Sequence, residues 1–291
     1  WTKRYHKRIL ILSITYDNNQ FIAVGCFGII LTSPDGITWT VRIAGISYTH
    51  RIISVTYGNN QFIALGYDGT ILTSPDGLIW TERFAEETYN IKPRFVTYCD
   101  NQFIAIDYSG TILTSPDGTT WTARSSGSKT YFNSVTYGNN QFIALSGKLI
   151  LTSPDGATWT TRYTGTTSRL SSVTYGNNQF ITVGDDGSIL TSPDGAIWTE
   201  GASGTTNWLE SITYGNNQFI AVGRGGLIIT SPDGVTWTER ASGTTKWLYS
   251  VVYGNNQFIA VGDSGSIISS KADATGIIKS NLDSKATQTL S

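Results

Sequence analysis

Tyr57-Gly58-Asn59-Asn60-Gln61-Phe62-Ile63-Ala64 is one copy of a phrase that occurs seven times, with small changes, along this chain of 291 residues. The other six copies begin at Tyr16, Tyr98, Tyr137, Tyr175, Tyr214 and Tyr253. A second phrase, Ser-Pro-Asp-Gly followed by two residues and a tryptophan, occurs six times and ends at Trp39, Trp80, Trp121, Trp159, Trp198 and Trp237. A regular period of about 40 residues indicates a repeat architecture.

Each repeat contains four segments with the character of β-strands. In the second copy these are residues 53–57, 61–65, 70–73 and 79–83. Gly58-Asn59-Asn60 joins the first two segments, and because glycine and asparagine tolerate positive φ, it predicts a tight hairpin. Ser74-Pro75-Asp76-Gly77 joins the third and fourth segments and is also typical of a turn. The repeats show no helical periodicity.

Phe62-Ile63-Ala64-Leu65 is apolar at consecutive positions, which predicts a strand buried on both faces. A blade that packs between two other blades provides that environment. Four short strands in each of seven units predict an all-β fold, a seven-bladed β-propeller of four-stranded blades. An open solenoid is the structural alternative, but it would need atypical capping repeats, and the N-terminal end shows none. We expect the propeller to span residues 1–270, with a C-terminal tail or linker at 271–291.

The seventh repeat lacks its fourth strand, since Gly276 stands where a tryptophan is due. The chain begins Trp1-Thr2-Lys3-Arg4, which matches the fourth-strand phrase Trp80-Thr81-Glu82-Arg83 of the second repeat. We therefore expect the N-terminal strand to complete the last blade and close the ring, which would remove two exposed sheet edges. The alternative gives this place to Gly276-Ile277-Ile278-Lys279.

The repeated turn is similar to the Asp-box of sialidase-like propellers, with one residue fewer before the glycine. The whole unit from Gly69 to Trp80 looks still more like the repeats of photosystem II stability/assembly-factor-like propellers, which are also seen in bacterial and phage surface proteins. The resemblance covers about residues 1–270. It implies a propeller fold in which the Asp-box is a structural turn between the two outer strands, away from the ligand face. It says little about function, because propellers carry unrelated activities.

Composition narrows the range of partners. The formal net charge is −1 and 14% of the residues are charged, so a nucleic-acid partner gains no electrostatic support. No apolar stretch approaches the roughly 18 residues that a transmembrane helix needs. Polarity carried mainly by Thr, Ser, Asn and Gly suits an extracellular or cell-surface protein. Cys26 and Cys99 fall in turns that a propeller places on opposite faces, so we expect free thiols.

We do not expect an enzyme. A sialidase, as the resemblance implies, needs an arginine cluster, a tyrosine nucleophile with a carboxylate partner and an acid, all at singular positions. Here the arginines repeat from blade to blade, at Arg42, Arg83, Arg124, Arg162 and Arg240, and so do the tyrosines. Catalysis needs different groups that converge at one point. We therefore predict no catalytic residue, no metal and no cofactor, and interpret Asp185, Asp186 and Asp263 as solvated turn carboxylates rather than cation ligands.

The positions that vary between repeats are the candidates for binding. One position in the connections between blades holds Leu10 and then Arg51, Lys92, Tyr131, Arg169, Trp208 and Trp247. The next position is almost uniformly apolar, which predicts core. We predict that the six residues from Arg51 to Trp247 line one face beside the turns between second and third strands, because exposed Trp, Tyr and Arg are frequent binding anchors. Alternatively, Trp208 and Trp247 only cover the blade edge.

Three functions follow from this reading. The first is a non-enzymatic binding module that recognises a glycan or a protein on the inter-blade loop face, at a cell or particle surface. The second is a structural subunit of a surface assembly or filament, a homo-oligomer joined through residues 271–291 or a sheet edge. The third is a sialidase-like glycoside hydrolase.

Overall fold

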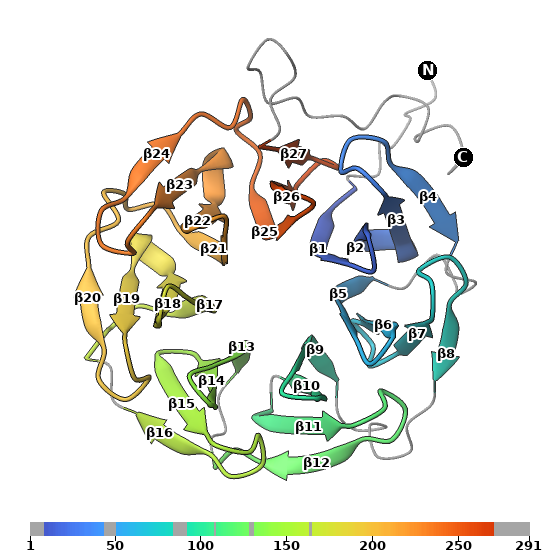
Figure 1. The fold of residues 1–291 in the computed structure, drawn as a ribbon, viewed down its shortest axis with the longest axis horizontal. Coiled ribbons are helices and arrows are strands. Elements are labelled where there is room, and N and C mark those ends of the chain that lie inside the picture. The colour runs from blue at the N-terminus through green and yellow to red at the C-terminus, as the bar shows by residue number, and fades with distance from the viewer. Residues whose placement is uncertain are drawn as a thin grey trace, which may run out of the picture.

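Seven antiparallel sheets surround a central axis, each built from consecutive strands (Figure 1). The computed structural model describes residues 9–43, 51–83, 92–107, 109–127, 131–162 and 165–270. In each sheet the first strand lies nearest the axis and the last lies at the rim (Figure 1). The predicted seven-bladed, all-β propeller is thereby confirmed.

Six sheets have four described strands and the seventh has three. The first three blades are β1 (Ile11–Asp17), β2 (Gln20–Gly25), β3 (Ile29–Ser33) and β4 (Thr40–Ile43); β5 (Ile52–Gly58), β6 (Gln61–Gly66), β7 (Ile71–Ser74) and β8 (Thr81–Arg83); and β9 (Pro93–Cys99), β10 (Gln102–Asp107), β11 (Thr111–Ser115) and β12 (Thr122–Ser125). The next two are β13 (Phe132–Gly138), β14 (Gln141–Ser146), β15 (Leu149–Ser153) and β16 (Thr160–Arg162); and β17 (Leu170–Gly176), β18 (Gln179–Gly184), β19 (Ile189–Ser192) and β20 (Thr199–Gly201). The last two are β21 (Leu209–Gly215), β22 (Gln218–Gly223), β23 (Ile228–Ser231) and β24 (Thr238–Arg240); and β25 (Leu248–Gly254), β26 (Gln257–Gly262) and β27 (Ile267–Ser269).

Short 3₁₀ turns join the second and third strands in several blades, at η1 (Cys26–Gly28), η3 (Asp185–Gly187) and η4 (Arg224–Gly226). The hairpins between first and second strands have the predicted geometry. Asn59 and Asn60, for example, take φ values of 46° and 59°. Two consecutive residues with positive φ match the twist of the flanking strands, which explains the repeated asparagines.

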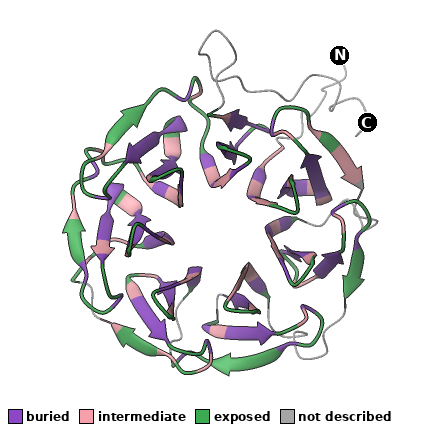
Figure 2. Cartoon of the chain, viewed as in Figure 1, coloured by how far each residue is buried: buried purple, intermediate pink, exposed green. Residues whose placement is uncertain are grey.

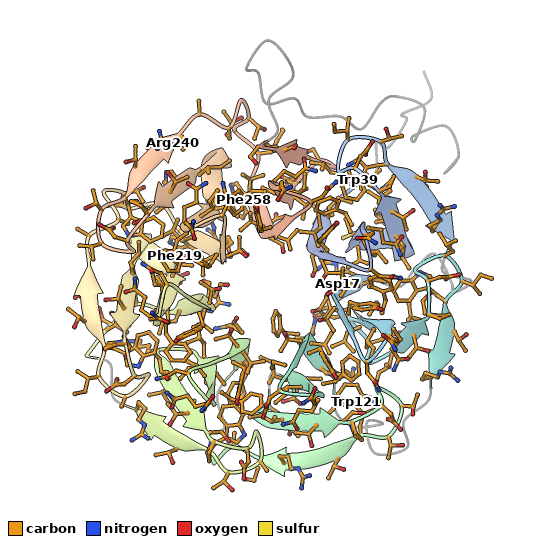
Figure 3. The ribbon with its side chains drawn as sticks, in the orientation of Figure 1. Asp17, Trp39, Trp121, Phe219, Arg240 and Phe258 are labelled. Atoms are coloured by element: carbon orange, nitrogen blue, oxygen red, sulfur yellow. The ribbon has the colours of Figure 1, made fainter. Side chains whose placement is uncertain are left out.

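The apolar core lies between blades rather than in the middle of the ring. It consists of seven clusters, each shared by two neighbouring blades. The second strands, such as β6, are buried on both faces as predicted, whereas the rim strands are largely exposed (Figure 2). Figure 3 shows Phe219 and Phe258 inside their blades and Arg240 at the rim. Burial against two neighbouring blades explains why the second strand of each blade is continuously apolar.

The repeated aspartate has the structural role that the resemblance implied. Asp117 Oδ1 accepts hydrogen bonds from the Thr119 and Thr120 amides, at 2.9 and 2.7 Å. Ser115 Oγ donates to the same carboxylate at 3.1 Å. Trp121 closes the turn, since its Nε1 donates to Gly118 O at 3.1 Å. The same bonds recur at the other five copies, so this aspartate holds the turn between the third and fourth strands.

Neighbouring blades are linked by a repeated side-chain hydrogen bond. Gln61 Nε2 donates to the backbone oxygen of Asp117, in the turn of the next blade, at 2.6 Å. Equivalent bonds run from Gln20, Gln102, Gln141, Gln179 and Gln257. The Gln257 bond reaches Asp35 at 2.6 Å and so joins the last blade to the first. These bonds place the asparagine hairpins and the Ser-Pro-Asp-Gly turns on one side of the ring, the hairpin face.

The ring is closed by contacts between the first and last blades. Gly265 N donates to Ile9 O at 2.9 Å, Leu10 and Asp263 form an antiparallel bridge, and one apolar cluster joins β1–β3 to β26 and β27. The expected fourth strand of the last blade, Trp1 to Arg4, lies outside the described residues, as do the alternative Gly276–Lys279 and the tail at 271–291. Closure by the N-terminal strand therefore stays a prediction.

The hydrogen-bonded turn aspartates predict loss of stability in acid. The Thr120 amide, and then the Thr119 amide, lower the pKa of Asp117 to about 2, from 3.8. The pKa of Asp35, Asp76, Asp155, Asp194 and Asp233 is lowered too. A carboxyl whose pKa is lower in the folded protein than in the unfolded chain contributes its full stabilisation of the fold above pH 3.8. This contribution is lost as the pH falls toward the pKa of the folded state.

We expect the urea midpoint to change little from pH 7 to about 5 and to fall steeply between about pH 4 and 2. Urea unfolding followed by circular dichroism at each pH checks this. A midpoint that holds constant down to about pH 2 would show that these six carboxylates are not coupled to folding.

Candidate ligand-binding face

The second side of the ring, the connection face, consists of the inter-blade connections and the turns between second and third strands. Backbone hydrogen bonds hold the predicted binding residues there. Arg51 O accepts from Tyr67 N at 2.8 Å, and Trp247 O accepts from Asp263 N at 2.8 Å. Equivalent bonds hold Tyr131, Arg169 and Trp208. The predicted placement beside these turns is thus confirmed for five of the six residues, and Lys92 directly precedes β9 in the same register.

The predicted exposure is confirmed for five of the six residues, and the predicted burial of the next position is confirmed for all six. Tyr131 is 64% exposed and Trp247 is 41% exposed. Arg51, Lys92 and Arg169 are exposed, and Trp208 is half-buried. The residues that follow them along the chain are all buried: Ile52, Pro93, Phe132, Leu170, Leu209 and Leu248. The partial burial of Trp208 has a cause that the sequence did not reveal.

Trp208 and Trp247 come from neighbouring blades, and Arg224 in η4 brings them together. The Arg224 Cζ lies 3.4 Å from the centre of the Trp208 ring and 4.2 Å from that of Trp247. Arg224 Nε donates to Glu210 Oε1 at 3.2 Å, and this hydrogen bond is a third contact of the same side chain. The Trp247 ring in turn meets Tyr249 edge-on, with centroids 6.5 Å apart. We call Trp208, Arg224, Trp247 and Glu210 the stacked cluster.

Arg169 joins blades 4 and 5. Its Nη2 donates to Asn133 Oδ1 at 2.8 Å, and its Nη1 lies 4.0 Å from Asp185 Oδ1. Burial raises the pKa of the Asp185 carboxyl, and the charges of Arg169 and Arg224 oppose this. Polar contacts thus join blades 4 and 5 on the connection face, and the charge of Arg224 in blade 6 acts on Asp185.

The interpretation of the turn carboxylates as solvated is wrong for two of the three. The Asp185 side chain is only 16% exposed, and its Oδ1 lies 4.0 Å from Arg169 Nη1. Asp263 is 1% exposed, because the chain at Leu10 bridges to it at the junction of the first and last blades. Asp186 is exposed as expected. In the described part of the chain, no three His, Cys, Asp or Glu residues lie close enough together to hold a metal ion.

A second group of contacts forms around Tyr67 in blades 2 and 3. The Arg94 Cζ lies 3.4 Å from the centre of the Tyr67 ring, and that of Arg51 lies 5.8 Å away. A hydrogen bond from Arg94 and its charge, followed by the charges of Arg51 and Lys92, lower the pKa of the Tyr67 hydroxyl. Arg51 and Lys92, both predicted to bind a ligand, therefore lie in the same group of cations around Tyr67.

Sequence reasoning missed Arg224, Glu210, Tyr67 and Arg94, although a signal for them exists. Two positions vary between repeats as freely as the predicted one. The first lies two residues after the predicted binding position and holds Leu12, Ile53, Arg94, Asn133, Ser171, Glu210 and Tyr249. The second opens the turn between second and third strands and includes Cys26, Tyr67, Asp185, Arg224 and Asp263. All three positions meet on the connection face.

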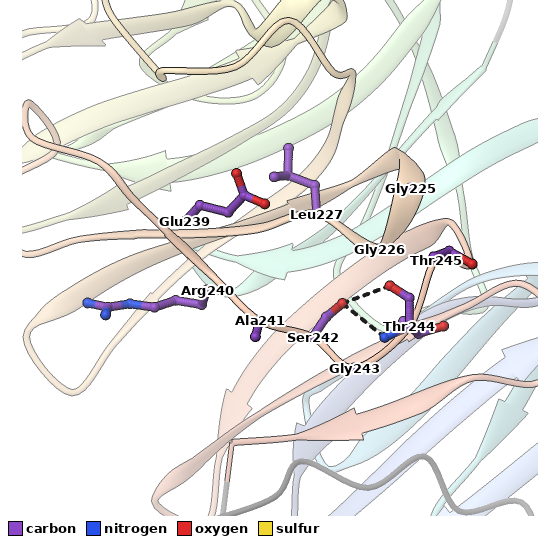
Figure 4. A pocket seen from close by; sticks show the side chains of 10 residues that line it. All are labelled: Gly225, Gly226, Leu227, Glu239, Arg240, Ala241, Ser242, Gly243, Thr244 and Thr245. Carbon is purple, nitrogen blue, oxygen red and sulfur yellow. Dashed lines mark hydrogen bonds between the residues drawn. The ribbon is translucent and has the colours of Figure 1, made fainter.

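Two hollows of about 600 and 640 Å³ lie at equivalent places in blades 6 and 5. Figure 4 shows the first, which is lined by Leu227, Ser242 and Thr244 among others. Ser242 Oγ is held by Thr244, donating to its oxygen at 3.0 Å and accepting from its amide at 3.3 Å. Because both hollows have the same glycine- and hydroxyl-rich lining, they are features of the blade rather than a singular site.

Cys26 and Cys99 are free thiols, as predicted. Burial, and then the charge of Asp100, raise the pKa of the Cys99 thiol to about 12. A thiol with this pKa forms almost no thiolate at neutral pH, and the thiolate is the reactive form.

We expect a Cys26→Ala protein to react with a thiol reagent at about pH 8 only after unfolding, as followed by absorbance. Rapid stoichiometric labelling of the folded protein would contradict this.

No protein-family model matches the chain. No curated protein matches its sequence. The fold is nevertheless similar to solved propeller structures. Ycf48 bound to a D1 peptide aligns with a TM-score of 0.77 and 20% identity, over 91% of this chain and 92% of that chain. Ycf48 from Cyanidioschyzon merolae aligns with a TM-score of 0.72 and 19% identity, over 90% and 97%.

The WD40 propeller domain of Doa1 aligns with a TM-score of 0.73 and 14% identity, over 91% of this chain and 94% of that chain. Likeness at such identities concerns the fold. The chain is thus a seven-bladed propeller whose structure is similar to Ycf48, and the predicted resemblance to photosystem II stability/assembly-factor-like propellers is confirmed at that level. Within the described ranges, no helix is long and apolar enough to cross a membrane.

Proposed function

We propose that this propeller is a non-enzymatic module that binds a segment of a protein partner on its connection face. The stacked cluster is the observation that carries the proposal. It joins side chains from two blades into one rigid, partly exposed surface, and its residues are not repeated in the other blades. Rigid aromatic and arginine side chains lose little conformational entropy on binding, so such clusters are typical hot spots.

The distribution of variation supports this face. The hairpin face is built from residues that repeat in almost every blade, and their hydrogen bonds hold turns and blades together. The connection face carries the residues that differ. A ring of near-identical blades can recognise an asymmetric partner only through positions that differ, so the connection face is the surface with the information to do so.

A protein partner is favoured over a glycan by one comparison. The similar propeller Ycf48 has been solved with a D1 peptide bound, so a propeller of this shape accommodates a peptide. The stacked cluster also resembles a protein-binding hot spot in composition, since it combines tryptophan with arginine. A location outside the cell or at a cell surface remains a prediction from composition.

The test compares Trp247→Ala with Ile197→Ala. Ile197 is a large apolar residue on the hairpin face, 73% exposed, and serves as the matched control. Labelled wild-type protein and both variants are applied to an array of random dodecapeptides and to a glycan array. We expect the wild type to bind a subset of peptides, Trp247→Ala to weaken that binding at least about tenfold, and Ile197→Ala to leave it unchanged.

All three proteins should fold, with the melting temperature of Ile197→Ala within about 2 °C of the wild type and that of Trp247→Ala within about 4 °C, since Trp247 is partly exposed but contacts Arg224. Binding to glycans and to no peptide would reject the protein partner in favour of a glycan. Peptide binding that survives in Trp247→Ala but is lost in Ile197→Ala would move the site to the hairpin face.

A further inference from the structure

The guanidinium of Arg224 contacts two indole rings that come from neighbouring blades. Its Cζ lies 3.4 Å from the centre of the Trp208 ring and 4.2 Å from that of Trp247. Both distances are in the range of a cation–π contact, so the Arg224 cation lies over the faces of two indole rings. The two rings therefore shield part of this cation from water.

One edge of the guanidinium is already used and the other is open. Nε donates to Glu210 Oε1 at 3.2 Å. Nη1 and Nη2 donate no hydrogen bond to any residue that the structure describes, and the Arg224 side chain is 32% exposed. The open end carries the N–H donors of both terminal nitrogens in one fixed plane. Because two indoles and Glu210 contact the same side chain, they restrain these donors before any ligand arrives.

We propose that the open end of Arg224 binds a carboxylate of the protein partner, with Trp208 and Trp247 as the walls of the subsite. A planar carboxylate matches the two terminal nitrogens of arginine with two parallel hydrogen bonds. The flanking indoles contact the apolar part of the side chain or chain end that carries the carboxylate. This inference rests on the proposed function and names the chemistry that the stacked cluster selects.

Two carboxylates lie in reach of the Arg224 charge, Glu210 and Asp185, and burial raises the pKa of Asp185 while the charge of Arg224 opposes this rise. Glu210 occupies only the Nε edge and leaves the terminal nitrogens open to a ligand. Lys246, which precedes Trp247 in the same connection, is exposed. The second group of contacts on the connection face is also cationic, with Arg51, Lys92 and Arg94 around Tyr67. An acidic segment that reaches across the face would therefore meet cations in two places.

The experiment uses four pools of random decapeptides. One pool contains Asp and Glu and a second replaces them by Asn and Gln, and each is made with a free and with an amidated C terminus. Binding of each pool to the full chain is measured for the wild type and for Arg224→Gln, Arg224→Lys and Arg240→Gln. Arg240 lies on the exposed rim strand β24 and is the matched arginine control.

We expect the wild type to bind at least one carboxylate-bearing pool about tenfold or more tightly than the neutral, amidated pool. Arg224→Gln should abolish this preference, and Arg240→Gln should retain it. Arg224→Lys keeps the charge but cannot form two parallel bonds, so it should also lose most of the preference. The pool that is preferred shows whether the carboxylate belongs to a side chain or to the C terminus.

The outcomes separate this inference from the proposed function. A wild type that binds none of the pools would reject both. Peptide binding without a carboxylate preference, or a preference that persists in Arg224→Gln, would overturn the inference and leave the proposed function standing. Should Arg224→Gln fail to fold, Arg224→Lys decides: a folded lysine variant that keeps the full preference contradicts the two-bond geometry.

Discussion

Replacing Trp121 by alanine should cost about 3–5 kcal/mol of the free energy of unfolding, the range for truncation of a fully buried tryptophan. Trp121 is 1% exposed and belongs to the apolar cluster between blades 2 and 3 (Figure 3). Its ring centroid lies 6.5 Å from that of Phe103, and its Nε1 donates to Gly118 O at 3.1 Å. The substitution therefore leaves a cavity at a blade junction and an unpaired carbonyl in the turn.

Trp39 provides the control, because it has the same neighbours in the first blade but is only half-buried. Its ring lies 6.3 Å from that of Phe21, and its Nε1 donates to Gly36 O at 3.1 Å. Trp39→Ala removes less buried area and should cost clearly less. Urea unfolding monitored by far-UV circular dichroism measures both. Equal losses for the two variants would show that burial between blades is not what gives these tryptophans their weight.

Gly226→Ala should be among the most damaging single-methyl changes on the connection face. Gly226 has a φ of +75°, and a Cβ there would lie 2.0 Å from the backbone oxygen of Thr244. A backbone atom cannot rotate away as a side chain can, so the turn η4 or the connection that leads to Trp247 must move. We expect a loss of about 3 kcal/mol or more, from φ strain and the displaced backbone together.

Gly225→Ala separates these two contributions. Gly225 has a φ of +70°, but a Cβ there would meet no atom within 4 Å. This variant should therefore show the φ strain alone, about 1 kcal/mol. Thermal unfolding of both proteins compares them directly. A Gly226→Ala protein as stable as Gly225→Ala would mean that the connection yields without cost, and that the stacked cluster is less rigid than its contacts indicate.

The fold was predictable because the hairpin, the turn and the buried strand of each repeat can all be recognised from local sequence. The asparagine pair supplies positive φ twice in succession, the Ser-Pro-Asp-Gly phrase supplies a turn, and the apolar run from Phe62 to Leu65 requires burial on both faces. Each of these is a local property that one repeat displays in full. Only closure of the last blade depends on a match between distant segments, and that prediction concerns Trp1 to Arg4, outside the described residues.

The site was predictable only in part, because its members depend on contacts between blades. The alignment of repeats located Trp208 and Trp247, since they occupy a position whose residue type changes from blade to blade. It did not show that Arg224 contacts both of them, because that contact depends on how the turn of one blade faces the connection of the next. Asp185 was misjudged for the same reason: its partial burial beside Arg169 follows from the packing of the face and not from its place in a turn.

The central claim is that the connection face binds the partner, and hydrogen–deuterium exchange with mass spectrometry tests it most directly. Exchange is measured for the free protein and for its complex with the tightest peptide from the array. We predict slower exchange in the complex at residues 185–188, 208–210, 224–227 and 246–249, and no change at the hairpin-face turns of residues 33–38, 115–120 and 153–158. Slower exchange confined to those turns, with the connection face unchanged, would contradict the account.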